Sequence, residues 1–428
     1  MARDLHRTID AVWRLESARI IGAIARRVRD VGLAEELAQD ALVAALEHWP
    51  VDGIPDNPGA WLMATAKNRA LDRLRQLNLH HARQQELGAD ADARGDHVVP
   101  DFVDSLDDAD DIGDDLLRLI FTACHPVLSR EAQLALTLKL LAGMSTAEIA
   151  RAFLVPEATI AQRIVRAKRT LAEARVPFEV PGAAERAQRL SSVLEVIYLV
   201  FNEGYSATSG GHWVRPTLCE DALRLGRILA QLAADEPEVH GLAALMEIQA
   251  SRLAARIGPG GEPILLMDQN RARWDQLLIR RGLAALARAE AHGGALGPYA
   301  LQAAIAACHA RAIAAADTDW PRIAALYDAL AALTPSPVVE LNRAVAVAMA
   351  FGPRAGLAIV DALVADESLP EYHLLPSVRG DLLGRLGRNA EACAEFKRAA
   401  ELTRNERERT LMLERAAACA STIAGAAR

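Results

Sequence analysis

Apolar residues recur at intervals of three and four along most of the chain, the spacing of one face of an α-helix. In the first 87 residues, two such stripes precede a loop over Val51–Ala60 that contains two prolines and two glycines. A third helix is expected to begin at Pro58, because proline is tolerated in a first turn, and to continue through Arg75. The two stripes are Ile20, Ile21, Ile24 and Val28, then Leu37, Ala41, Ala45 and Trp49.

The stretch MSTAEIARAFLVPEATIAQRIVRAKRTL, beginning at Met144, predicts two short helices on either side of a proline. Ser145 and Glu148 have the spacing of a capping box, so the first helix is expected to start at Ser145. Pro156 cannot continue that helix but can start the next one. In the second helix, apolar residues line one face and basic residues lie largely elsewhere: Ile160, Ile164 and Leu171 against Arg163, Arg166, Lys168 and Arg169. This is the pattern of a helix-turn-helix with a basic second helix.

Two more helices are expected upstream of this pair, over Asp115–Cys124 and Ser129–Ala142, and Gly143 is expected to end the second. Downstream, the segment RVPFEVPG (residues 175–182) contains two prolines and a glycine. It is the best candidate for a domain boundary, because such residues interrupt helices. Everything after it is again alanine-rich and helical in pattern.

A degenerate repeat is present near the C-terminus. YDALAAL begins at Tyr327, VDALVAD at Val360 and FKRAAEL at Phe396, in steps of 33 and 36 residues. In the last unit four residues fall at the offsets of a tetratricopeptide repeat: Gly380, Ala392, Phe396 and Ala399. The tryptophan and tyrosine of that pattern are absent. Stacked helix pairs are predicted, and a generic helical bundle is the alternative.

The composition favours the same fold class. The chain has 428 residues, of which 51% are hydrophobic but only 4% aromatic. Alanine and leucine, which favour helix, are abundant, whereas the residues that favour strands are sparse. The sequence therefore predicts an all-α protein of about two to four domains.

The negative charge is concentrated in one segment. The whole chain carries a net charge of −8, but residues 88–115 alone contain eleven aspartates and one arginine, a local net of −10 that leaves +2 elsewhere. The segment has few apolar residues and no period, so it is predicted to be a mobile linker. The acidity of the whole chain therefore does not argue against nucleic-acid binding outside this segment.

Several other classes of protein find little support. The five cysteines are odd in number and form no CxxC pair, so neither a disulfide framework nor a zinc finger is expected, and buried reduced thiols are the better interpretation. The N-terminus MARDLHRTID lacks the apolar core of a signal peptide, and no run is apolar enough to span a bilayer. The protein is therefore expected to be cytoplasmic and without contact to a membrane.

No cofactor, metal or catalytic site is expected. The adjacent histidines of LHHARQQ point in different directions on a helix and are poor metal ligands. FNEGYSATSGGHW (residues 201–213) contains glutamate, serine and histidine, but it has no nucleophile elbow and no convincing third partner. A structural or docking loop explains it better than catalysis does, so the protein is not expected to be an enzyme.

The residues VPEATIAQRIVRAKRTL resemble the pattern PxxTVxSRxxRARxxL of the extracytoplasmic-function (ECF) group of the sigma-70 family, with Gln162 in place of the frequent serine. AEELAQDALVAALEHW (residues 34–49) resembles the segment by which such factors grip core RNA polymerase. NPGAWLMATAKNRALDRLRQ (residues 57–76) resembles the segment that opens and reads the −10 promoter element. Residues 199–210, 325–348 and 372–388 are similar to the tetratricopeptide-like C-terminal extension of one sigma subgroup.

The resemblance implies promoter DNA and core RNA polymerase as partners and gives the candidate residues roles. For the −10 region these are Trp61, Lys67, Asn68, Arg69, Asp72, Arg73 and Arg75. For the −35 region they are Thr159, Gln162, Arg163 and Arg166 near base edges, with Lys168 and Arg169 toward phosphates. For polymerase binding they are Glu35, Glu36, Gln39, Asp40, Leu42, Leu46 and Trp49.

Simpler roles stay open for some of these residues. Trp61 could lie near the point of strand opening or pack in the core. The basic cluster after Lys67 could be a solvated helix face, and an amphipathic helix within its own domain would look like the polymerase-binding segment. The resemblance also implies that the acidic segment threads the polymerase cleft and the RNA exit path, with a solvated spacer as the alternative.

Four parts are predicted. Residues 9–87 form a sigma region 2 domain, 88–113 an acidic linker, 114–176 a sigma region 4 helix-turn-helix domain, and 183–428 a helical domain that is expected to regulate the factor and to be the place where a regulatory protein would bind. Two competing hypotheses are a helix-turn-helix regulator that never joins polymerase, and a scaffold or hydrolase built on the C-terminal domain.

Overall fold

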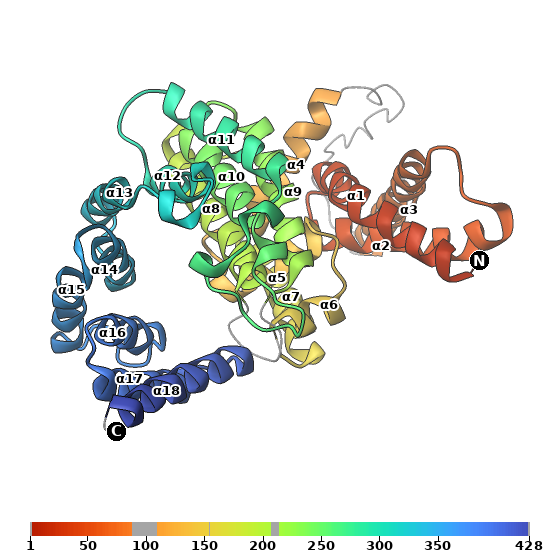
Figure 1. The fold of residues 1–428 in the computed structure, drawn as a ribbon. Helices are drawn as coiled ribbons and strands as arrows, with labels where there is room; N and C mark the ends of the chain where they lie inside the picture. The colour runs from red at the N-terminus through yellow and green to blue at the C-terminus, as the bar shows by residue number, and fades with distance from the viewer. Residues whose placement is uncertain (1, 88–108, 154, 207–213, 427–428) are drawn as a thin grey trace. The chain divides into compact units, whose positions relative to one another are not determined.

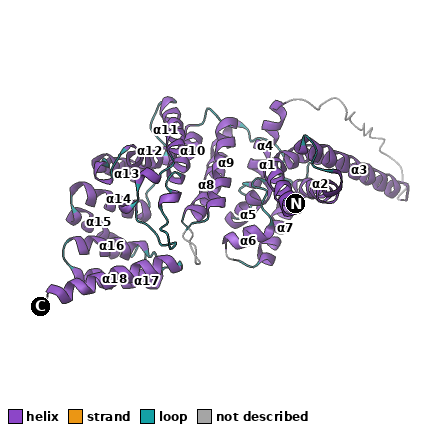
Figure 2. Cartoon of the chain, turned by 45° about the vertical axis from the view of Figure 1, so that its right-hand side comes forward, coloured by secondary structure: helices purple, strands orange, loops and turns teal. Residues whose placement is uncertain are grey.

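The computed structural model describes residues 2–87, 109–153, 155–206 and 214–426. Figures 1 and 2 show a chain built of helices, and in the described ranges β pairing is limited to an isolated bridge between Ile257 and Pro263. The predicted all-α class is confirmed. No helix in these ranges is long and apolar enough to cross a membrane.

The chain forms two compact units, Met1–Val196 and Ile197–Arg428. The division falls inside a helix, α8, that runs from Ala183 to Tyr205. The other helices of the first unit are α1 (Ala2–Val28), α2 (Val31–Asp52), α3 (Pro58–Leu87), α4 (Ala109–Ala123), α5 (Arg130–Leu140), α6 (Thr146–Phe153) and α7 (Glu157–Glu173).

The core of the first unit forms where α1 packs against α2, α3 and α4. Ile20, Ile21 and Ile24 of the predicted stripe are at most 1% exposed. The third helix begins at Pro58 as predicted. Helix α4 begins at Ala109, so residues 109–113 are helical where a linker was expected, because extending an established helix costs less than starting one. Residues 88–108 of the predicted linker lie outside the described residues.

The helix-turn-helix has the predicted structure. The backbone N–H of Ser145 donates to Glu148 Oε2 at 2.8 Å, and the N–H of Glu148 donates to Ser145 Oγ at 3.2 Å, which completes the capping box. Gly143, in the left-handed region with φ 70°, lies just beyond the end of α5. The predicted apolar stripe of α7 is buried: Ile160, Ile164 and Leu171.

The N-terminal half of α8 belongs to the first unit. The Arg189 Nη2 group donates to the carbonyl of Phe121 at 3.1 Å, and Arg130 pairs with Glu195 at 2.5 Å. These contacts explain why the units divide after Val196, whereas the sequence suggests a boundary before residue 183. The proline-rich segment 175–182 interrupts the helices but does not separate the units.

The second unit is a succession of neighbouring helices. Its members are α9 (Pro216–Leu232), α10 (Pro237–Ala250), α11 (Gln276–Ala291), α12 (Pro298–Arg311), α13 (Trp320–Leu333), α14 (Pro337–Phe351), α15 (Pro353–Ala365), α16 (Leu374–Arg385), α17 (Asn389–Leu402) and α18 (Glu406–Ala426). Short 3₁₀ turns lie at Leu253–Ala255, Leu266–Asp268, Arg271–Arg273 and Ala315–Asp317. From α13 onward each helix packs against the next, as predicted for stacked helix pairs.

The residues at the repeat offsets meet in the core of the second unit. Ala392, Phe396 and Ala399 are at most 3% exposed. A Cβ atom on Gly380 would lie 2.9 Å from the Phe396 ring, so only glycine lets α16 approach that ring. Gly241 has the same function between α10 and α12, because a Cβ there would lie 2.6 Å from the backbone nitrogen of Ala300.

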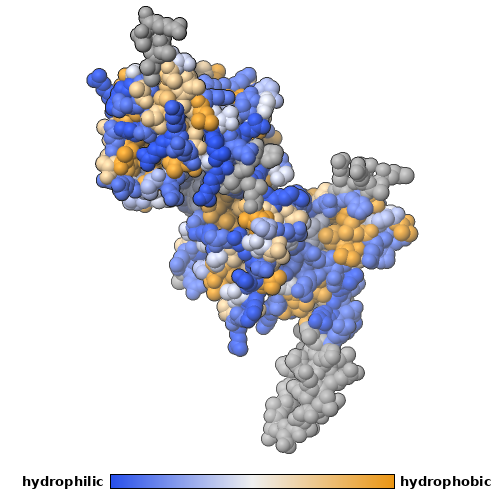
Figure 3. Space-filling model, turned by 90° about the horizontal axis from the view of Figure 1, so that it is seen from below, coloured by the Kyte–Doolittle hydropathy of each residue, from blue (hydrophilic) through white to orange (hydrophobic). Residues whose placement is uncertain are grey.

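The cysteine thiols are reduced, and the surface carries both hydrophilic and hydrophobic residues. All five cysteines are free; Cys124, Cys219 and Cys308 are buried as expected, whereas Cys393 and Cys419 are only partly buried. On the face drawn in Figure 3, hydrophilic residues alternate with small hydrophobic areas.

Candidate polymerase-binding and DNA-binding surfaces

Helix α2 has an exposed side that is both acidic and apolar. Its N-cap, Asp30, accepts the backbone N–H of Leu33 at 2.9 Å and so fixes where the helix begins. Glu36 and Asp40 are exposed on this side, and Val43 and Leu46 are 50% and 36% exposed. Their spacing places these four on adjoining turns of one surface. An acidic and apolar stripe of this kind suits a partner with basic and apolar groups.

The other residues predicted to bind polymerase are buried or half-buried and do not belong to this exposed side of α2. Trp49 is 2% exposed, and its ring meets that of Trp61 edge-on with centroids 5.5 Å apart. Trp61 is half-buried against Trp49 and His48, so it packs between α2 and α3. Leu42 and Gln39 are half-buried.

Glu35 is in a buried ion cluster. It is 6% exposed and pairs with Lys139 of α5, at 3.5 Å, and with Lys168 of α7. We call these three residues the ion triad. In this arrangement Glu35 is closed to any partner protein, and the ammonium of Lys168, whose side chain is 17% exposed, is bound to Glu35 instead of a phosphate. The roles predicted for both therefore require the triad to open.

The exposed face of α3 carries most of the residues predicted for the −10 region. Asn68, Arg69, Asp72, Arg73 and Arg75 are exposed, and Lys67 is half-buried. Arg75 lies 3.5 Å from Asp72, and Arg69 lies 3.7 Å from Asp40 of α2. These exposed pairs are weak, so their arginines can exchange a carboxylate for a phosphate.

The N-terminal half of α7 presents the predicted −35 residues on one face. Gln162 and Arg166 are exposed, and Thr159 and Arg163 are half-buried, at spacings of three and four. Near the C-terminal end, Arg169 pairs with Glu173 at 2.6 Å, and that hydrogen bond raises the pKa of the arginine. Base-reading groups at the start of a helix and cations farther along suit entry into a major groove.

The comparisons with known proteins agree with this geometry. Family models for sigma-70 region 2 and sigma-70 region 4 match residues 14–79 and 118–171. The probable ECF RNA polymerase sigma factor SigI of Mycobacterium tuberculosis is 29% identical over 184 residues, which cover 42% of this chain and 60% of that protein. The ECF RNA polymerase sigma factor SigK of Mycobacterium ulcerans is 29% identical over 158 residues, 36% of this chain and 78% of its own.

The chain belongs to the ECF group of the sigma-70 family. Beyond regions 2 and 4, this sigma factor carries a C-terminal extension, in which residues 189–290 match a family of unknown function (DUF6596). An uncharacterized protein of Rhizobium meliloti is 45% identical over 408 residues, 94% of this chain and 95% of that protein. No solved structure matches the chain.

In this sigma factor regions 2 and 4 pack against each other. Asp115 of α4 is 2% exposed, and it binds Arg118 at 2.7 Å and Arg26 of α1 at 3.3 Å. Glu148 of the capping box also pairs with Arg14 of α1. Burial opposes ionisation of Glu148, but the hydrogen bonds from Ser145 and the charge of Arg14 outweigh it and lower the pKa of that carboxyl.

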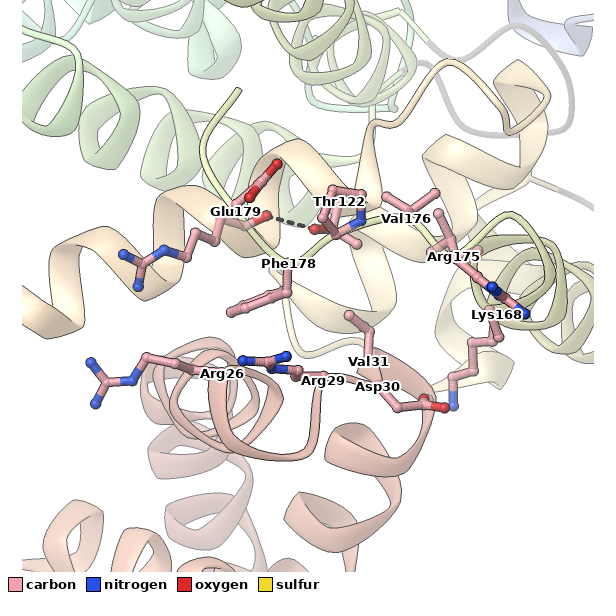
Figure 4. A pocket seen from close by; sticks show the side chains of 15 residues that line it. Arg26, Arg29, Asp30, Val31, Thr122, Lys168, Arg175, Val176, Phe178 and Glu179 are labelled. Atoms are coloured by element: carbon pink, nitrogen blue, oxygen red, sulfur yellow. Dashed lines mark hydrogen bonds between the residues drawn. The ribbon is translucent and has the colours of Figure 1, made fainter. Parts of the chain in front are cut away.

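A cavity of about 790 Å³ lies between the two regions (Figure 4). Its walls come from the end of α1, the start of α2, helices α4 and α7, and the segment that follows α7. Figure 4 shows Arg29 and Phe178 facing each other across it, with Lys168 beside Asp30. Because both regions line the cavity, it exists only while they are packed.

Sequence reasoning missed the residues that join regions 2 and 4. Arg14, Asp115 and Lys139 each contact residues that are distant in the chain. The capping box gave Glu148 a local function but no sign of its second partner. Contacts separated by about a hundred residues leave no local pattern.

The described residues of the segment FNEGYSATSGGHW make structural contacts. Glu203, at the end of α8, pairs with Arg215, and Gly204 makes a close approach to the backbone of Cys219. Residues 207–213, with the remaining serine and the histidine, lie outside the described residues. No group of three or more His, Cys, Asp or Glu residues in the described part of the chain is placed to hold a metal ion.

Proposed function

We propose that this sigma factor binds core RNA polymerase through the exposed side of α2 and directs it to promoters. The stripe of Glu36, Asp40, Val43 and Leu46 carries the proposal. A regulator that only binds DNA has no need of such a surface. As a transcription factor without a membrane-spanning helix in its described part, it is expected in the cytoplasm.

Promoter recognition is assigned to α3 and α7. The exposed face of α3, with Asn68, Arg69, Asp72, Arg73 and Arg75, would contact the −10 region. Thr159, Gln162, Arg163 and Arg166 would lie nearest the base edges of the −35 element, because amide and guanidinium groups can read them. Lys168 would join Arg169 at the phosphates once the ion triad opens.

The test is run-off transcription with core polymerase and genomic DNA fragments. The double variant Glu36→Arg with Asp40→Arg should lose polymerase binding, because reversed charges repel a basic partner surface. A double variant at two exposed carboxylates outside α2, Glu185→Arg with Glu220→Arg, controls for net charge. Normal co-purification of the α2 variant with polymerase would reject the assigned surface.

Arg166→Ala tests the DNA-reading helix. It should weaken binding to a mapped promoter by about 1–3 kcal/mol if Arg166 contacts a base, and the loss should depend on the −35 sequence. Arg186→Ala, at an exposed arginine of α8, is the matched control. Unchanged transcription from that promoter would remove Arg166 from the interface.

The alternative function is a helix-turn-helix regulator that acts without polymerase. It predicts specific promoter binding by the chain alone and no promoter-specific transcript when core polymerase is added. The exposed stripe on α2 disfavours it.

The C-terminal extension is proposed to modulate transcription. Helical arrays build extended concave surfaces that suit protein or peptide partners. The residues at 372–388 that resemble the sigma subgroup form α16 and the turn before and after it, within the stacked helices. This role is independent of the promoter contacts and is tested by removing the extension.

A further inference from the structure

A groove in the second unit combines unpaired charge with small residues. It encloses about 780 Å³ and is lined by α9, α10 and α11, and α10 packs against both of the other two. Its floor and walls contain alanines on all three helices, among them Ala230, Ala243 and Ala284. Because these side chains are small, a polypeptide segment can approach the helices closely.

Two arginines stand on one wall without a carboxylate partner. Arg281 and Arg288 lie seven residues apart on α11, so two turns place them about 10.5 Å apart along one face. Both are exposed, and neither forms an ion pair with a described residue. The third arginine of the groove, Arg227 of α9, already binds Glu247 Oε1 at 2.7 Å.

The floor of the groove holds two buried acceptors that lack donors. Glu247 is 4% exposed, and its second carboxylate oxygen, Oε2, has no hydrogen-bond partner. His240 is also 4% exposed, and its Nε2 lies 2.7 Å from the carbonyl of Ala234. A carbonyl can only accept, so Nε2 carries the proton and Nδ1, which has no partner, is an acceptor in the neutral ring.

These features describe one kind of ligand. Two cations call for carboxylates about 10 Å apart, and buried acceptors call for N–H donors. An extended peptide in the polyproline II conformation offers both, because its backbone N–H groups form no internal hydrogen bonds and every third residue returns to the same face at about 9.3 Å. A helix uses its own N–H groups internally, and nucleic acid has few donors to satisfy a buried carboxylate.

We propose that the groove of α9, α10 and α11 binds an extended acidic peptide segment of a partner protein. Carboxylates of the peptide pair with Arg281 and Arg288. A shift of the Glu247 and His240 side chains toward the groove then lets peptide amides donate to Glu247 Oε2 and His240 Nδ1, which are buried while the groove is empty. The contact requires neither polymerase nor DNA, so it can be tested independently of the promoter-directing function.

The experiment uses the full chain and a fluorescein-labelled peptide of twelve residues, with glutamate at every third position and alanine between. Fluorescence anisotropy at low salt should show saturable binding. The parent protein should bind the same peptide with glutamine in place of glutamate at least tenfold more weakly. The double variant Arg281→Glu with Arg288→Glu should also bind the glutamate peptide at least tenfold more weakly than the parent does. The matched charge control is Arg280→Glu with Arg354→Glu, at exposed arginines outside the groove, which should stay within twofold of the parent.

A steric pair tests the location independently of charge. Ala284→Trp fills the groove and should abolish binding, whereas Ala287→Trp, exposed on the same helix but outside the groove, should not. Circular dichroism confirms that each variant is folded. Equal binding of the glutamine peptide, equal affinity in the Arg281 and Arg288 variant, or tighter binding of a twelve-nucleotide single strand at the same groove would overturn the proposal.

Discussion

At the scale of single residues, the carboxylate of Glu35 links three helices by pairing with two lysines. It is nearly inaccessible and neutralises lysines from α5 and α7. Removing one partner of a buried ion cluster leaves the other charges uncompensated, which costs about 3–5 kcal/mol. Glu35→Gln should therefore lower the free energy of unfolding of the first unit by roughly that amount, measured by urea denaturation.

The neighbouring Glu36→Gln is the matched control. Glu36 is exposed, and exposed substitutions usually change stability by no more than about 0.5 kcal/mol. If both variants unfold at the parental urea concentration, the ion triad contributes nothing to the packing of regions 2 and 4.

His309 makes the second unit sensitive to acid. Burial, together with the charges of Arg252 and Arg271, lowers its pKa from 6.5 to about 3. A histidine whose folded pKa is depressed stays neutral in the native state, while the unfolded chain takes up the proton below pH 6.5. Its contribution to stability is thus complete above pH 6.5 and declines as the pH falls toward 3.

Between pH 7.5 and 5.5 this decline should amount to about 1.4 kcal/mol, one pKa unit of differential protonation. His309→Gln should reduce the loss of unfolding free energy over that interval by about this amount. A parental slope in the His309 variant would contradict the assignment.

At the scale of helices, glycine sets how closely α10 and α12 can pack. A methyl group on Gly241 would meet the backbone of Ala300, which cannot move without shifting the helix. Overpacking of this kind typically costs about 1–3 kcal/mol. Gly241→Ala should lower the melting temperature accordingly.

At Gly384 of α16 the same substitution is expected to change the melting temperature in the opposite direction. A methyl group there would make an ordinary contact, 3.9 Å from Ala392 Cβ. Alanine exceeds glycine in helix propensity by up to about 1 kcal/mol, so Gly384→Ala should raise the melting temperature. Equal shifts in both variants would mean that helix propensity, and not the contact with α12, governs the first.

Local patterns were sufficient to predict most elements of the first unit. The capping box, Pro58 and Gly143 each act within a few residues, so their effects can be predicted without a fold. The ion triad could not be predicted from the sequence, because its three members come from α2, α5 and α7. The division inside α8 also escaped prediction, since nothing in an amphipathic stripe tells which neighbour it covers.

At the scale of the whole molecule, the extension occupies more than half of the chain, and its effect on transcription can be measured by removing it. Cutting at Pro181 would also remove Arg189 and Glu195, which bind α4 and α5. Residues 1–196 keep these contacts. We expect this fragment to fold and to show altered activity, with loss more than release, in reconstituted transcription across a salt series.

Circular dichroism and binding to core polymerase control for the fold of the fragment. The fragment 1–180, tested in parallel, should be less stable because it lacks the first half of α8. Equal activity and equal polymerase affinity of residues 1–196 and the full chain at every salt concentration would show that the extension serves no purpose in initiation.

The ion triad has a quantitative consequence for the affinity of free sigma factor for promoters. If Lys168 binds a DNA phosphate as proposed, it cannot pair with Glu35 at the same time, so the full set of promoter contacts is open only to the fraction of molecules in which the triad is open. The apparent dissociation constant equals the intrinsic one divided by that fraction. If about one molecule in a hundred is open, isolated factor needs about a hundredfold higher concentration to occupy a site. Surplus molecules that have not met polymerase would then leave promoters empty instead of blocking them.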